Sequence, residues 1–170
     1  FISINLQLKK MFLIFLLNGY LKVLLLQLNH YMQINFTIII ISHGFQGNLL
    51  GIRSVLENFN YIATGTMMSG YFAGFFVGAY SIPNLVSKVG HIRVFAAFAS
   101  MASLSSLVHV VFVDPLVWVL ARFLTGFSMI GIFVIVESWL NDRANNKTRG
   151  KVLSLYMFIT FTGLALGNLL

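Results

Sequence analysis

The chain has 170 residues, of which 58% are apolar and only 9% are charged, and its mean hydropathy is +0.88. A soluble core of this length does not need so much apolar material, so the composition excludes an ordinary soluble domain and indicates a polytopic membrane protein. The net charge of +7 would favour a nucleic acid as the partner of a soluble domain, but here the expected partner is the lipid bilayer and the charge reports topology.

The sequence offers no metal or cofactor motif. Cysteine is absent, which excludes disulfides and thiolate ligands. The four histidines are far apart, and none is at metal-ligand spacing from another. We therefore expect neither a metal nor a cofactor.

Residues 1–32 differ from the rest of the chain, because they contain neither alanine nor an acidic residue. An apolar run at 11–28 follows two lysines and would suit a short span or the core of a signal peptide. Polar residues at positions 18, 22 and 29 fall on one helical face, however, and favour a helix lying in the membrane interface. Phe1 is not a natural start, so we interpret 1–32 as an atypical segment, either an interfacial helix or an artefact.

From residue 33 onward, apolar segments of membrane-spanning length alternate with short polar loops. A helix needs about 20 mainly apolar residues to cross a bilayer. We predict five spans, at 33–51, 61–82, 92–113, 116–140 and 152–170, and we expect Pro83 to end the second. The predicted fold is an all-α membrane bundle. Its last span is still apolar at Leu170, so we expect the chain to be a fragment.

The basic residues are distributed unequally between the loops. The loops after the second and fourth spans hold six of them: Lys88, Arg93, Arg143, Lys147, Arg149 and Lys151. The loops after the first and third spans hold only Arg53. The positive-inside rule therefore places the N-terminus and the two basic loops in the cytoplasm.

The fourth span carries a cation among apolar residues. Arg122 lies in its first third, and Gly126 follows on the same helical face. A buried arginine costs at least about 2.5 kcal/mol by insertion scales, so it normally faces a bundle interior or an aqueous cavity. We expect Arg122 either to contact substrate or couple a proton, or to hold the bundle together by hydrogen bonds.

The first span holds polar side chains beside glycines. His43, Gln46 and Asn48 occur among three glycines in the stretch SHGFQGNLLG. These side chains either line a substrate path or make hydrogen bonds between helices, and His43 could titrate near neutral pH.

The second span has a glycine at every fourth position. Gly70, Gly74 and Gly78 form a doubled G-x-x-x-G stripe, which permits close approach of another helix. We interpret this stripe, together with Gly126, as a packing surface.

These features resemble the first half of a major facilitator superfamily transporter. The sequence RFLTG at 122–126 is similar to the fourth-helix motif R-x-x-Q-G, with Thr125 in place of Gln. The turn SKVGHIR at 87–93 is similar to the loop D-R-x-G-R-R, although Ser87 replaces its Asp and Pro83 its leading Gly. Three longer strings, SHGFQGNLLGIR, VGHIRVF and ESWLNDRANNKTRGKVLSLYM, are similar to a subgroup of bacterial transporters of unassigned substrate.

The resemblance covers 33–170 and implies a protein of about twelve helices in two six-helix halves. It implies a small-solute site at the midplane between the halves, alternating access, a role for Arg122 in proton coupling or substrate contact, and location in a bacterial inner membrane. It also implies a cytoplasmic loop or gate, for which the candidates are Lys88, Gly90, Arg93, Glu137, Asp142, Arg143 and Arg149.

Two alternatives remain. A membrane enzyme would need a convergent catalytic group, and the only candidate is His109-x-x-x-x-Asp114, the dyad of glycerolipid acyltransferases. We expect this match to be fortuitous, because the His ends a helix and the Asp begins an Asp-Pro turn. The other alternative is a truncated or degenerate membrane protein without transport activity.

Overall fold

The computed structural model describes residues 28–144 and 146–170. Its five helices are α2 (Leu28–Leu56), α3 (Tyr61–Val89), α4 (His91–Val111), α5 (Pro115–Arg143) and α6 (Arg149–Leu169), and this part of the chain contains no strand. The predicted all-α bundle is confirmed. The interpretation of 1–32 falls mainly on residues 1–27, outside the described residues.

The helices differ in how apolar they are. Within the described ranges, α4, α6 and residues Pro115–Asp142 of α5 are long and apolar enough to cross a membrane. Helices α2 and α3 are each 29 residues long, but polar residues and glycines interrupt their apolar runs.

Side chains cap the N-termini of α3 and α5. The Asn60 side chain caps α3 by accepting from the Ala63 N–H at 2.7 Å. The Asp114 side chain caps α5 by accepting from the Val117 N–H at 3.0 Å, and proline follows at the first helical position. Both arrangements satisfy N–H groups that have no partner within the helix.

The prediction that Pro83 ends a helix was wrong, because Pro83 lies inside α3. Proline removes one helical hydrogen bond, but packing can offset that loss. Ile82 and Val86, on either side of it, are buried in the core. Helix α3 ends instead at Gly90, whose φ of 92° favours glycine.

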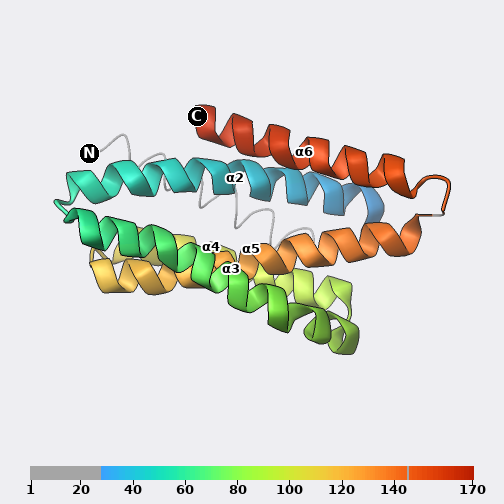
Figure 1. The fold of residues 1–170 in the computed structure, drawn as a ribbon, viewed down its shortest axis with the longest axis horizontal. Coiled ribbons are helices and arrows are strands. Elements are labelled where there is room, and N and C mark those ends of the chain that lie inside the picture. The colour runs from blue at the N-terminus through green and yellow to red at the C-terminus, as the bar shows by residue number, and fades with distance from the viewer. Residues whose placement is uncertain (1–27, 145) are drawn as a thin grey trace.

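The bundle consists of two groups of helices (Figure 1). Helix α5 packs extensively against α3 and α4, and α2 packs extensively against α6. Contacts between these two groups are far fewer and come mainly from α5 with α6 and with α2. We call the boundary between the α3–α4–α5 group and the α2–α6 pair the seam.

Glycines bring the backbones together inside each group. A Cβ atom added to Gly74 of α3 would collide with the Phe123 carbonyl of α5, and one added to Gly126 would collide with the Tyr71 carbonyl. In the other group, a Cβ on Gly44 would lie 2.8 Å from the Leu164 carbonyl oxygen. Among the described residues, the glycines that meet the backbone of another helix therefore do so within a group.

The seam is filled by side chains. At the end of the molecule that carries the basic loops, the Phe36 ring of α2 lies 5.9 Å from Phe133 of α5 and 5.3 Å from Tyr156 of α6, between centroids. A small pocket of about 80 Å³ opens beside Phe36 and Tyr156, and its lining is almost wholly apolar. Aromatic packing thus holds the seam at this end.

Candidate functional site

Arg122 is buried in the first third of α5. The residue is only 6% exposed. Its guanidinium carbon lies 4.8 Å from the centroid of the Tyr71 ring of α3, a cation–π contact. Its Nη2 is 3.9 Å from the Met68 sulfur, a weak acceptor. The cation is therefore held mainly through the face of an aromatic ring.

His43 of α2 lies against the same tyrosine. The His43 and Tyr71 rings are stacked, with centroids 5.1 Å apart and an interplanar angle of 26°. The structure thus brings Arg122 and His43, two sequence-predicted candidates, together across the seam. Tyr71 joins them and was not predicted, because an aromatic residue in a glycine-rich span is more often a packing residue.

The polar atoms of this cluster are incompletely bonded. Within the described part of the chain, the buried Nε and Nη1 of Arg122 and the buried Nδ1 of His43 have no hydrogen-bond partner. Buried polar groups normally have partners, and a buried cation without one is especially costly. An acceptor is therefore missing from this site.

The other two candidates from the first span lie apart from this cluster. The Gln46 Nε2 donates to Ser106 Oγ of α4 at 3.0 Å, and both residues are buried. The exposed Asn48 donates to the Asn168 carbonyl of α6 at 3.0 Å. In this structure both residues tie helices together.

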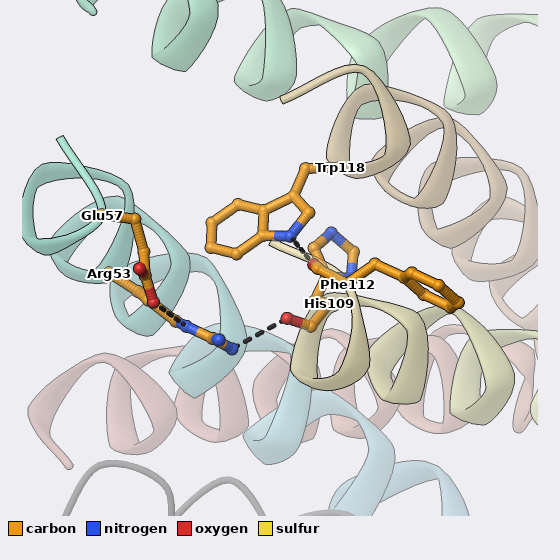
Figure 2. Close-up of polar contacts among 5 residues, drawn as sticks. All are labelled: Arg53, Glu57, His109, Phe112 and Trp118. Carbon is orange, nitrogen blue, oxygen red and sulfur yellow. Dashed lines mark hydrogen bonds and ion pairs between the residues drawn. The ribbon is translucent and has the colours of Figure 1, made fainter. Parts of the chain in front are cut away.

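A second polar cluster at the other end of the seam was missed by the sequence analysis (Figure 2). Arg53, near the end of α2, donates from Nη1 to the His109 carbonyl at 2.8 Å and from Nε to Glu57 Oε1 at 3.3 Å. Its guanidinium carbon also lies 5.2 Å from the Trp118 ring centroid. We call Arg53, Glu57, His109 and Trp118 the outer cluster.

Trp118 anchors the outer cluster to the turn between α4 and α5. The residue is fully buried, and its Nε1 donates to the Phe112 carbonyl at 2.6 Å. The Phe59 and His109 rings pack beside it, with centroids 4.9 Å and 5.6 Å away. Only one feature of the sequence indicates this cluster: Arg53 is the one basic residue in the loops after the first and third predicted spans.

The H-x-x-x-x-D match carries no catalytic geometry. The His109 side chain is buried, with Nδ1 2.6 Å from the Ser105 carbonyl oxygen. The Asp114 carboxylate caps α5. The two side chains therefore have separate structural roles, and the described residues hold no group of His, Asp and Glu that could bind a metal.

The candidate gate residues lie at the opposite end. Lys88, Gly90, Arg93 and Glu137 are exposed, and the Arg143 side chain is outside the described residues. His91 Nε2 lies 3.0 Å from Ser138 Oγ and 3.7 Å from the Asp142 carboxylate. The exposed Arg149 donates to Asn141 Oδ1 at 2.9 Å. These contacts join the two basic loops to the end of α5.

The chain is similar to known membrane transport proteins. The sequence model of the Major Facilitator Superfamily matches residues 11–170. Among curated relatives, the uncharacterized MFS-type transporter YcaD of Salmonella arizonae is 30% identical over 106 residues. That match covers 62% of this chain and 28% of the relative. The YcaD proteins of Salmonella newport and Salmonella heidelberg match to the same extent. No solved structure matches.

Proposed function

Because this chain belongs to the Major Facilitator Superfamily, we propose that it forms part of a secondary transporter that moves a small solute by alternating access. The matched segment covers 28% of the length of the curated relatives, so the complete protein would contribute further helices to the transport path. In that arrangement the N-terminus and both basic loops face the cytoplasm of a bacterial cell, across its inner membrane.

The observation that carries this proposal is the Arg122–Tyr71–His43 cluster. An ionised side chain buried within a membrane-spanning helix generally faces a path for solutes or ions. Arg122 contacts Tyr71 and Met68 of α3 within its own helix group. The stacking of Tyr71 on His43 of α2 extends the cluster across the seam, where backbone contacts are few. A substrate path along α2, α3 and α5 explains both its position and its missing acceptor.

Uptake by vesicles tests the proposal. Cells expressing the complete gene would supply membrane vesicles, which are offered labelled sugars, amino acids, organic acids and cationic dyes with and without an imposed proton gradient. We expect the vesicles to accumulate one solute class and Arg122→Ala to abolish that accumulation. If transport is coupled to protons, accumulation will also require the imposed proton gradient. Lys147→Ala is the matched control, because Lys147 is exposed in a loop.

Three outcomes are informative. Accumulation that persists in folded, membrane-inserted Arg122→Ala would remove Arg122 from the transport mechanism. Accumulation that is indifferent to the gradient would remove proton coupling. No accumulation of any solute by inserted protein would favour the alternative of an inactive, degenerate chain.

A further inference from the structure

We infer that the transported solute carries a carboxylate, which binds the free N–H groups of Arg122 with His43 beside it. This inference rests on the proposed function and names the substrate class of the same site. The evidence begins with the buried N–H groups of Arg122 that have no acceptor.

A guanidinium has five N–H donors, and all of them need acceptors or water when buried. At Arg122 the Nε and Nη1 atoms have no acceptor among the described residues, and Nη2 has only a thioether sulfur at 3.9 Å. The Tyr71 ring covers a face of the group and cannot accept in its plane. The N–H groups at the edge of the guanidinium therefore lack oxygen acceptors.

The chain itself has no acid to fill this role. Its four acidic residues are Glu57, Asp114, Glu137 and Asp142. Glu57 pairs with Arg53, Asp114 caps α5, and Glu137 and Asp142 lie in the last two turns of α5. Arg122 lies at the start of the third turn of that helix, so these two carboxylates are several turns away from it.

Arg53 shows how this protein accommodates an arginine that has only a structural role. Like Arg122, it lies over an aromatic ring, at 5.2 Å compared with 4.8 Å. Unlike Arg122, it also contacts a carboxylate and a backbone carbonyl. The difference between two otherwise similar sites is a missing anion at Arg122.

The surroundings favour a single carboxylate over a more highly charged ligand. Planar carboxylates match the guanidinium fork, and one fixed cation balances one negative charge. His43 Nδ1 supplies a further unpartnered polar atom against the same ring. Gly47 lies one turn from His43 on α2, where an added Cβ would meet nothing within 4 Å, so space is open on that face.

Uptake by proteoliposomes containing the complete gene product tests the substrate class. The probes are labelled benzoate and lactate, with phosphate, glucose and tetraphenylphosphonium for comparison. We expect uptake of a monocarboxylate, with an apparent affinity at least about thirty-fold weaker in Arg122→Gln, as expected when one partner of a buried charge pair is lost. Arg122→Lys, which keeps the charge without the fork, should lie between the two, and Lys147→Gln should match the wild type.

The outcomes separate this inference from the proposed function. Uptake of glucose or tetraphenylphosphonium that persists in Arg122→Gln would contradict a carboxylate substrate and would still support the proposed transport function. Uptake of phosphate alone would also overturn it. No uptake of any probe, from inserted protein, would count against both.

A stability measurement provides a readout independent of transport. In carboxylate-free buffer we expect Arg122→Gln to unfold at the same temperature as the wild type or higher, because an unpaired buried charge is removed. Arg53→Gln should unfold at a lower temperature. Benzoate should raise the unfolding temperature of the wild type and not that of Arg122→Gln. If Arg122→Gln is destabilised as much as Arg53→Gln, an acceptor within the protein already satisfies Arg122, and the inference fails.

Discussion

Arg53 and Arg122 differ in how they stabilise the bundle, because they have different partners. Arg53 joins α2 to the α4–α5 turn through a charged hydrogen bond to the His109 carbonyl, and such bonds contribute about 1.5–3 kcal/mol. Its ion pair with Glu57 is partly buried and joins residues four positions apart, and pairs at this spacing contribute about 0.2–0.5 kcal/mol. The bond to the carbonyl therefore accounts for most of its effect.

Arg53→Lys should lower the free energy of unfolding by about 1–2 kcal/mol. Lysine keeps the charge, but it cannot present separate N–H groups to Glu57 and the His109 carbonyl while lying flat over Trp118. Unfolding of the purified protein in detergent measures the change. Arg93→Lys is the control, since Arg93 is exposed and its replacement should stay within about 0.5 kcal/mol. Equal stability of the two variants would show that the outer cluster needs only a positive charge.

The two polar clusters differ in how far the sequence could predict them. Arg122 was identifiable, because a charge within an apolar run is visible without knowing its neighbours. The outer cluster was not, since the contacts of Arg53 with His109 and Trp118 join residues 56 or more positions apart, and no local pattern encodes them. For the same reason Gln46 was identifiable as polar, while its partner Ser106 was not.

At the scale of helices, glycine spacing controls which pairs approach closely. Gly74 and Gly126 lie at the crossing of α3 and α5, where each faces backbone atoms of the other helix. Backbone cannot move aside as a flexible side chain can. Small residues at these positions therefore set the distance between the two helices.

Gly74→Ala should destabilise the protein by about 1–3 kcal/mol, the usual cost of overpacking. Gly65→Ala, on the same helix, meets nothing within 4 Å and should be neutral or stabilising by up to about 1 kcal/mol. Thermal unfolding of both variants in the same detergent gives the comparison. A Gly74→Ala protein as stable as Gly65→Ala would show that α3 and α5 lie further apart than described.

Helix boundaries were only partly predictable. Asp114-Pro115 predicts a tight turn, and the structure adds the cap that the Asp side chain forms. Pro83 predicts a helix end, because proline strongly disfavours a helix interior, and the sequence does not reveal that Ile82 and Val86 are buried beside it. Tertiary packing overrode the local preference there.

At the scale of the whole molecule, charge is sorted between the two ends. Lys88, Arg93, Lys147, Arg149 and Lys151 belong to loops or helix ends at one end of the bundle, and Arg53 lies at the other. The distribution follows from alternating helix directions, which the span order predicts. Orientation across the membrane remains a prediction from the positive-inside rule.

Single cysteines can test that orientation, since these 170 residues contain none. Val113→Cys places a thiol in the exposed turn before α5, and Asn146→Cys places one in the basic loop before α6. In intact cells we expect a membrane-impermeant maleimide to label the first and to label the second only after permeabilisation. The opposite pattern would reverse the assigned orientation.

The division into two helix groups has a mechanical consequence. Glycine contacts make each group stiff, because backbones in direct contact cannot slide without steric overlap. The seam relies on side chains, which change rotamers at low cost, so it is the compliant joint of the structure. Arg122, Tyr71 and His43 lie on this joint. A ligand that draws Arg122 and His43 together would therefore rotate one stiff body against the other and leave every helix unbent.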